Sequence, residues 1–180
     1  ISRGEIIEIG GSYRLPEIIK ETGLDMIEVG TTNKTNLDDY TTALEDFPNS
    51  IILKVHRSNY SISGFTEEVS IRELANIKEK YETVLIHDLG SGLVIDRKFL
   101  EINNIDIFNN ETSVQNSLDE GSDLVMFSGD KLFGSVQSGI IAGKSRFVEN
   151  IREYSLFRTY RCSPSCLLYT SDAADELRSV

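Results

Sequence analysis

The sequence contains no tryptophan, only two cysteines and only three prolines among its 180 residues. Two cysteines cannot form a secreted disulfide framework, which favours a reducing compartment such as the cytoplasm. No apolar run approaches the roughly 20 residues that a membrane-spanning helix needs, so we expect no membrane association. The N-terminus resembles neither a signal nor a transit peptide and does not begin with methionine. We therefore expect the chain to be a piece of a longer protein.

Acidic side chains outnumber basic ones, 29 against 18, which gives a formal net charge of -11. This charge argues against a broad nucleic-acid-binding face on this piece. With 39% hydrophobic and 26% charged residues, the composition is that of an ordinary globular domain. The length suffices for one domain with a hydrophobic core, and a wholly disordered chain is excluded.

Short apolar runs alternate with amphipathic stretches along most of the chain. Continuous apolar runs are typical of strands that are buried on both faces of a parallel sheet. Strands are predicted at residues 24–29, 51–56, 83–88, 124–128 and 139–142. Capping and periodicity predict helices at residues 16–22, after Asn36, after Ser70, and at residues 112–120 and 144–158. The alternation predicts an α/β fold with a mostly parallel sheet and flanking helices, in which ligands bind at the carboxyl ends of the strands.

The tail from residue 162 breaks this alternation. Cys162 and Cys166 could be two metal ligands, but the chain has no other cysteine and neither histidine is near in sequence. The four-ligand spacing of a zinc site is therefore absent. We expect residues 1–161 to be part of a large cofactor-binding domain and residues 162–180 to be a non-native or disordered tail.

An acidic residue and two glycines follow the strand predicted before residue 88, in the order Asp88-Leu89-Gly90-Ser91-Gly92. This order would place a carboxylate at the ligand edge of the sheet, beside backbone that a ligand can approach closely. Alternatively, Asp88 only caps the next turn, as Asp-x-Gly sequences often do. The motif alone leaves both interpretations open.

A lysine lies in the glycine-rich loop that follows the next predicted strand, in the order Ser128-Gly129-Asp130-Lys131. The order of a Walker loop is absent. A partly desolvated lysine beside a cofactor aldehyde can form a Schiff base, whereas an ordinary loop lysine is simply solvated. An acid that pairs with the pyridine nitrogen, followed after another strand by such a lysine, is the order found in pyridoxal phosphate enzymes with an aspartate-aminotransferase-like fold. Ser128 and the N–H groups after it could hold the cofactor phosphate.

Polar residues also follow the predicted strand at 51–56. His56 could act as an acid or base or stack on a cofactor ring, and Asn59 or Ser58 could bond the cofactor's phenolic oxygen. A purely structural, hydrogen-bonded role for His56 stays open. For His87, inside a predicted strand, the structural role is favoured.

Several segments in one order resemble the bacterial selenocysteine synthase family, the L-seryl-tRNA(Sec) selenium transferases. They are residues 1–5, 8–12, 28–35, 56–65, 88–92 and 127–131, and the similarity extends from residue 1 to about Arg161. The resemblance implies a pyridoxal-phosphate-dependent transferase of fold type I. Such an enzyme converts seryl-tRNA(Sec) to selenocysteinyl-tRNA(Sec) with selenophosphate, through an aminoacrylyl intermediate.

The same resemblance implies roles for individual residues. Lys131 matches the Schiff-base lysine and proton shuttle, Asp88 matches the partner of the pyridine nitrogen, and Asp130 is a weaker candidate for proton transfer. Arg158 and Arg161 match arginines thought to receive selenophosphate, although a basic helix end that interacts with its own dipole is also plausible. The resemblance further implies a homo-oligomer, a ring of dimers with active sites at subunit interfaces.

Some features depart from the family pattern. Residues 134–139 read Gly-Ser-Val-Gln-Ser-Gly, where the family usually has Gly-Gly-Pro-Gln-Ala-Gly. The family's upstream tRNA-binding segment and the pattern that follows Arg161 are missing, so we expect this piece to be inactive as supplied. Two alternatives stay open: a related fold-type-I pyridoxal phosphate lyase that acts on a small amino acid or amino sugar, and a non-enzymatic remnant.

Overall fold

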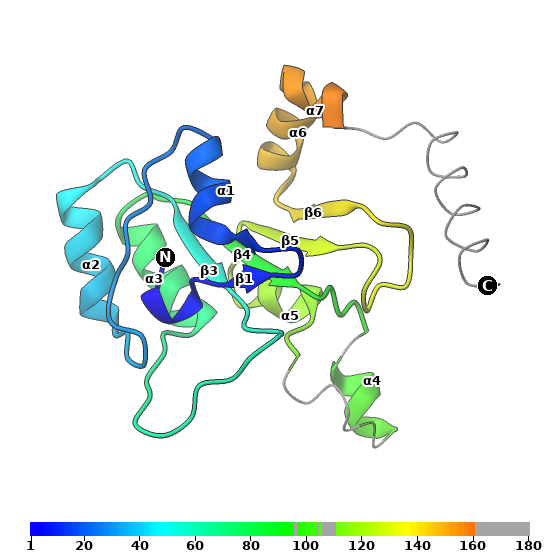
Figure 1. Cartoon of the computed structure of the whole chain (residues 1–180), viewed down its shortest axis with the longest axis horizontal. Coiled ribbons are helices and arrows are strands. Elements are labelled where there is room, and N and C mark those ends of the chain that lie inside the picture. Colours follow the sequence, from blue (N-terminus) through cyan, green and yellow to red (C-terminus); the bar gives the residue numbers. More distant parts are fainter. Residues whose placement is uncertain (96, 104, 106–110, 161–180) are drawn as a thin grey trace.

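The computed structural model describes residues 1–95, 97–103, 105 and 111–160 (Figure 1). Arg161 and the tail at residues 162–180, including Cys162 and Cys166, lie outside the described residues. The central four-stranded sheet has the order β3-β4-β5-β6. Its strands are β3 (Ile52–Val55), β4 (Leu85–Gly90), β5 (Leu124–Ser128) and β6 (Gly139–Gly143). Strands β3, β4 and β5 are parallel and β6 is antiparallel to β5, so the predicted mostly parallel sheet is confirmed.

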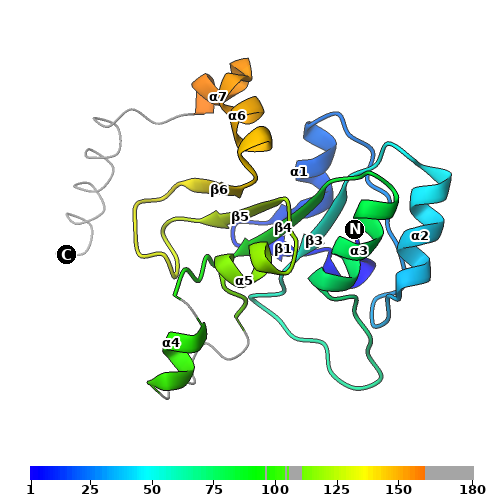
Figure 2. The ribbon, with the colours of Figure 1, turned by 180° about the vertical axis from the view of Figure 1, so that it is seen from behind.

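Short helices flank the sheet on both sides. They are η1 (Arg3–Glu5), α1 (Leu15–Glu21), α2 (Leu37–Asp46), α3 (Ile71–Lys80), α4 (Arg97–Ile102), α5 (Val114–Asp119), α6 (Ser145–Glu153) and α7 (Ser155–Tyr160), and a small hairpin pairs β1 (Glu8–Ile9) with β2 (Tyr13–Arg14). Helix α5 lies on one side of the sheet, and α1 and α6 lie on the other (Figures 1 and 2). Among the described residues, no helix is long and apolar enough to cross a membrane.

The helix cap predicted at Asn36 and the capping box predicted at Ser70 are present, both as capping boxes, and fix where α2 and α3 begin. The side chains of Asn36 and Ser70 each accept a hydrogen bond from the backbone N–H three residues later, and the acid at that position bonds back to the cap. Reciprocal bonds of this kind satisfy N–H groups that the first helical turn cannot pair internally.

Two predicted elements differ from the structure. The strand predicted at residues 24–29 is absent: Leu24 is 63% exposed, and only Val29 pairs, in an isolated bridge with Ser2. Four of the six residues are apolar, but no neighbouring strand pairs with the rest of the backbone. The helix predicted at residues 144–158 is interrupted at Tyr154, whose backbone is extended (ψ 133°), so that α6 and α7 are separate helices.

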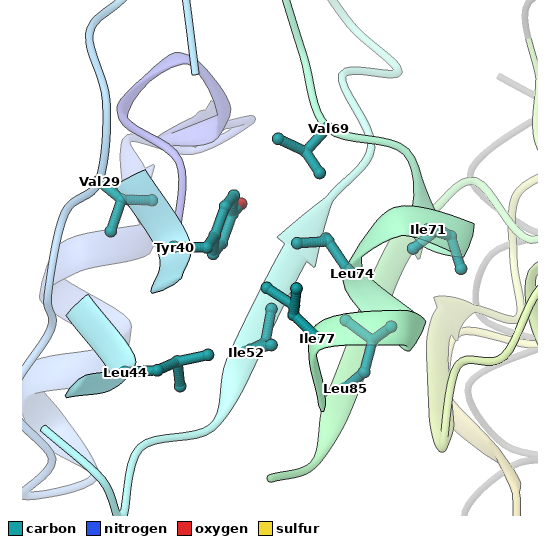
Figure 3. Packing of buried hydrophobic residues seen from close by; sticks show 9 residues of the cluster. All are labelled: Val29, Tyr40, Leu44, Ile52, Val69, Ile71, Leu74, Ile77 and Leu85. Atoms are coloured by element: carbon teal, nitrogen blue, oxygen red, sulfur yellow. The ribbon is translucent and has the colours of Figure 1, made fainter. Parts of the chain in front are cut away.

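The main hydrophobic core lies between α2, α3 and the first two strands of the sheet (Figure 3). It consists of Val29, Tyr40, Leu44, Ile52, Val69, Ile71, Leu74, Ile77 and Leu85. A second cluster, formed by Leu89, Val114, Val125 and Phe127, packs α5 against the carboxyl halves of β4 and β5. Burial of such side chains contributes roughly 1.5–3 kcal/mol each, so these clusters hold the sheet against its helices.

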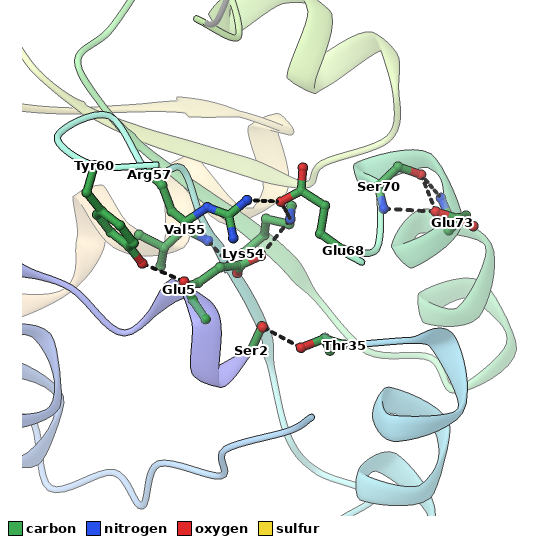
Figure 4. Close-up of polar contacts among 11 residues, drawn as sticks. Ser2, Glu5, Thr35, Lys54, Val55, Arg57, Tyr60, Glu68, Ser70 and Glu73 are labelled. Carbon is green, nitrogen blue, oxygen red and sulfur yellow. Dashed lines mark hydrogen bonds and ion pairs between the residues drawn. The ribbon is translucent and has the colours of Figure 1, made fainter. Parts of the chain in front are cut away.

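A buried ion pair attaches the N-terminal segment to β3 (Figure 4). Lys54 Nζ lies 2.6 Å from Glu5 Oε1, and the Val55 N–H donates to Glu5 Oε2 at 3.0 Å. The side chains of Glu5 and Lys54 are only 3% and 11% exposed. Glu5 thus uses both carboxylate oxygens, which a buried charge needs if its desolvation cost is to be offset.

A second buried carboxylate, Asp123, organises the amino end of the sheet. Its Oδ1 lies 2.8 Å from Lys78 Nζ and 2.7 Å from Lys144 Nζ, while the Leu85 N–H donates to Oδ2 at 2.9 Å. Burial alone would raise the pKa of Asp123, but the hydrogen bonds from Leu85, Lys144 and Lys78 outweigh it and lower the pKa. The carboxylate therefore stays ionised and links α3, β4, β5 and the start of α6.

We predict that Asp123→Asn destabilises the protein by about 3–5 kcal/mol, because it leaves the Lys78 charge buried without its partner. Lys144→Gln should cost at most about 1 kcal/mol, because the Lys144 side chain is 47% exposed. Urea unfolding of both variants checks this. Equal losses of unfolding free energy in the two variants would show that the buried Asp123–Lys78 pair contributes no more than the exposed Lys144 contact.

Candidate functional site

The carboxyl ends of β3, β4 and β5 meet at one edge of the sheet. Asp88 lies within β4 and pairs with Val55 on one side and Met126 on the other. The β4–β5 register shifts between Asp88 and Gly90, so one extra β4 residue is accommodated at this edge. Bulges of this kind re-aim side chains, and they are common beside functional sites.

The structure brings Asp88 and Lys131 together around Gly90. The Gly90 N–H donates to Asp88 Oδ1 at 3.1 Å. A Cβ placed on Gly90 would lie 4.0 Å from Lys131 Nζ and 3.5 Å from Ser58 Oγ. Gly90 has a φ of +64°, a conformation that favours glycine, so it turns the chain here and leaves space between the two side chains.

Burial raises the pKa of Asp88, and the Gly90 N–H and the Lys131 ammonium only partly oppose this. The Asp88 carboxylate is therefore desolvated without being fully compensated by its protein neighbours. Such a carboxylate suits a cationic ligand group, which would supply the missing stabilisation.

Lys131 lies on an exposed loop that is fastened at its base. The Gly129 N–H donates to Ser138 O at 2.8 Å, and the Ser135 N–H donates to Gly129 O at 2.7 Å. The Leu132 N–H donates to Ser91 O at 3.1 Å, which ties the lysine loop to the loop after Asp88. Ser135, at a position that departs from the family pattern, contributes to this network through its backbone. The side-chain change there therefore leaves this hydrogen bond in place.

The other sequence-predicted residues of this edge differ in how they meet Asp88: Ser128 shares a pocket with it, His56 is linked to it through the backbone, and the Asn59 side chain bonds another segment. Ser128 ends β5 and lines, together with Asp88, a pocket of about 290 Å³ whose apolar wall includes Met126 and Ile140. The His56 N–H donates to Asp88 O at 2.8 Å. Asn59 is exposed, and its Nδ2 donates to Glu8 O at 3.2 Å.

Two further predicted residues are not brought into contact with Asp88. Asp130 is exposed on the lysine loop. Arg158 is exposed on α7, and Figure 1 shows α7 away from the loop between β5 and β6. The cause is the antiparallel β6, which returns the chain to the amino end of the sheet before α6 and α7 begin. Arg161 lies outside the described residues.

His87 is a buried structural residue, as its place in a strand predicts. It is 3% exposed, its Nδ1 lies 2.8 Å from Ser117 Oγ, and Ser117 Oγ lies 2.9 Å from Ser122 Oγ. Burial lowers the pKa of His87 to about 3, so the imidazole is neutral at physiological pH.

The sequence-based predictions miss one acidic side chain at this edge. Glu111, in the segment before α5, has its Oε2 3.4 Å from His56 Nε2 and accepts a hydrogen bond from Ser91 Oγ at 2.5 Å. No motif or spacing marks Glu111, because the contact arises only when the segment before α5 folds back onto the strand ends. Within the described part of the chain, no group of three or more His, Cys, Asp or Glu residues could hold a metal ion.

Comparison with known proteins identifies relatives of this chain. A family model described as L-seryl-tRNA selenium transferase matches residues 1–173. The L-seryl-tRNA(Sec) selenium transferase of Alkaliphilus oremlandii is 44% identical over 161 residues, which are 89% of this chain and 33% of the relative. That of Haemophilus influenzae is 44% identical over 162 residues, covering 90% of this chain and 34% of the relative. The chain thus spans about a third of the length of the curated relatives it matches.

Solved structures resemble the chain at low sequence identity. D-Glucosaminate-6-phosphate ammonia-lyase superposes with a TM-score of 0.66 at 18% identity, over 99% of this chain and 42% of that chain. The archaeal O-phosphoseryl-tRNA(Sec) selenium transferase superposes with a TM-score of 0.52 at 15% identity, over 75% of this chain and 30% of that chain. These similarities confirm the predicted fold class, α/β with a mostly parallel sheet of the aspartate-aminotransferase-like type.

We predict that the protein loses stability as the pH falls below about 6.5, because His87 binds a proton in the unfolded chain but resists protonation when buried. Between pH 6.5 and 4.5, above the range in which most carboxylates titrate, the free energy of unfolding should fall by about 1.4 kcal/mol for each unit of decreasing pH. His87 should account for this slope. Urea unfolding at several pH values should show a flatter profile for His87→Asn. An unchanged slope in the variant would contradict this assignment.

Proposed function

Since the chain belongs to the L-seryl-tRNA selenium transferase family, we propose that its site binds pyridoxal 5'-phosphate and serves the conversion of L-seryl-tRNA(Sec) to L-selenocysteinyl-tRNA(Sec) with selenophosphate. The supporting structural observation is the placement of Asp88 and Lys131 around Gly90. Family membership supports the reaction type, and the chemistry of the site supports the cofactor. We also propose that the enzyme acts in the cytoplasm.

The residues at the sheet edge fit this cofactor. When bound, pyridoxal phosphate supplies an aldehyde that a lysine amine can hold covalently and a protonated ring that accepts electrons from a substrate's Cα. Lys131 is the amine, and the desolvated Asp88 carboxylate provides the negative charge for the ring nitrogen. Ser128 contributes a hydroxyl for the phosphate, while Ser58 and Asn59 are donors for the phenolic oxygen.

Proton transfer falls to Lys131. Lys131 is an exposed residue whose Nζ lies at the edge of the space left by Gly90, so the amine can take a proton from a bound substrate and return it. Asp130 precedes it on the same loop but is exposed, and it is the weaker candidate. His56 lies on the neighbouring strand end and can stack on a ring or orient one.

In this proposal, Arg158 binds selenophosphate only when subunits assemble. Within one chain α7 lies away from the lysine loop (Figure 2), so Arg158 would reach a site contributed by another subunit. This agrees with a homo-oligomeric ring of dimers whose active sites lie at subunit interfaces. Residues 1–161 would then be part of the large domain, and the remainder of the enzyme would supply the tRNA-binding parts.

A second candidate keeps the cofactor and changes the substrate. The superposition with D-glucosaminate-6-phosphate ammonia-lyase extends over 99% of this chain, which favours a lyase for a small amino acid or amino sugar. Assays of the full-length protein on seryl-tRNA(Sec), serine and amino sugar phosphates separate the two. Turnover of the small substrates without turnover of the tRNA would replace the first proposal by the second.

We predict that sodium borohydride fixes pyridoxal phosphate on Lys131 of the full-length protein, because reduction makes the bond between the lysine amine and the aldehyde permanent. Peptide mass spectrometry locates the label. Lys131→Arg should abolish it, whereas Lys20→Arg on α1 should leave it unchanged. A label elsewhere, or none, would refute the assignment of Lys131.

We predict that Gly90→Ala weakens pyridoxal phosphate binding roughly tenfold or more, because its methyl group occupies the space beside Lys131 and Ser58. Gly134→Ala is the matched control: Gly134 also has a positive φ (+69°), on the lysine loop, but a Cβ there meets nothing within 4 Å. Both variants should lose about 1 kcal/mol of stability from backbone strain. Absorbance titration should show weak binding only for Gly90→Ala, and equal affinities would contradict the prediction.

A further inference from the structure

A polar network joins the ends of β3 and β4 beside the proposed cofactor site. The Ser91 hydroxyl donates to Glu111 Oε2 at 2.5 Å, and the same oxygen lies 3.4 Å from His56 Nε2. Through its backbone, Ser91 also accepts the Leu132 N–H, one residue after Lys131. Ser91 therefore connects the carboxylate that faces His56 with the loop that carries the lysine.

The side chains of this network are held where solvent competes weakly. Those of His56 and Glu111 are 17% and 20% exposed, and Ser91 is buried at 7%. A short bond from a buried hydroxyl restricts where the carboxylate can lie, and the His56 backbone is itself fixed by its bond to Asp88 O. Both partners of the His56–Glu111 contact are thus anchored independently of that contact.

We propose that Glu111 is a positioning residue for His56, and this role in the reaction rests on the function proposed above. The 3.4 Å contact is electrostatic: an ionised carboxylate has no proton to donate and repels a nitrogen lone pair, so it favours a proton on the ring nitrogen that faces it. Glu111 therefore selects the imidazole form that is protonated at Nε2, and Nδ1 becomes the ring's acceptor on its other side. Fixing the tautomer and the ring plane prepares His56 to orient a flat ring or a reacting group at the sheet edge.

The network contains three residues from segments that are distant in sequence: the end of β3, the loop after β4 and the segment before α5. Because the backbone of Ser91 also holds the lysine loop, a displaced Ser91 would disturb both His56 and Lys131. The contribution of the carboxylate is separable from this backbone role, because Glu111 accepts from the Ser91 side chain, whereas the lysine loop is held by the Ser91 backbone C=O.

The test uses the 180-residue chain, which has only two histidines, with ¹⁵N-labelled histidine and no cofactor. Nuclear magnetic resonance distinguishes protonated from unprotonated ring nitrogens, and His87→Asn assigns the two rings. In the neutral wild-type imidazole, His56 should be protonated at Nε2. Glu111→Gln should lose this selectivity, because an amide can both donate and accept, and Ser91→Ala should lose part of it.

The second histidine and a matched variant provide the controls. The His87 ring is held by Ser117, so its tautomer reports folding and should stay the same in every variant except His87→Asn. Glu120→Gln removes a carboxylate at the far end of α5 and should leave both rings unchanged.

Two results would overturn the proposal: a wild-type His56 protonated at Nδ1 instead of Nε2, or a Glu111→Gln variant whose His56 signals match the wild type. If Glu111→Gln does not fold, the wild-type tautomer and Ser91→Ala decide. The measurement is independent of the borohydride label. A selected tautomer with no label on Lys131 would therefore keep the positioning role and reject the cofactor function.

Discussion

The position of every site residue depends on a charge that lies at the opposite end of the sheet. The Asp123 carboxylate binds the Leu85 N–H and two lysines, while its own backbone N–H and C=O bond to Leu85 and Lys144. These contacts fix the alignment of β4 between α3 and β5. Side chains alternate between the two faces of a sheet, so a shift by one residue would turn Asp88 from the pocket face into the core. The register set at Asp123 is therefore what allows Asp88 to meet Lys131.

Once this register is set, a few backbone hydrogen bonds suffice to arrange the loops at the carboxyl ends of the strands. Extended backbone aligns β3 with β4 up to the His56–Asp88 bond, and the shift before Gly90 turns the chain so that Ser91 can accept the Leu132 N–H. Backbone bonds therefore connect the three loops before any ligand is considered. Preorganisation of this kind reduces the ordering cost that a ligand would otherwise meet on binding.

The sequence predicts most of the sheet and places Asp88 and Lys131 at its carboxyl edge, because buried parallel strands leave continuous apolar runs and their ends collect polar groups. It fails where a local pattern depends on a distant partner. Residues 24–29 are mostly apolar but lack a neighbouring strand, and the helix after Lys144 breaks at Tyr154 although its periodicity continues. Glu111 was missed for the same reason, since only the folded chain places it against His56.

The antiparallel β6 also affects the order in which the site can assemble. Strands β5 and β6 are adjacent in sequence and close the short lysine loop, whereas β3 meets β4, and β4 meets β5, only after long crossovers through helices. Local contacts form faster than distant ones, because less chain entropy is lost in closing a short loop. The loop that carries Lys131 can therefore form early in folding. Asp88 takes its place beside this loop later, when the parallel strands β4 and β5 pair. Lys131 and Asp88 thus reach their places at different stages in the folding of one sheet.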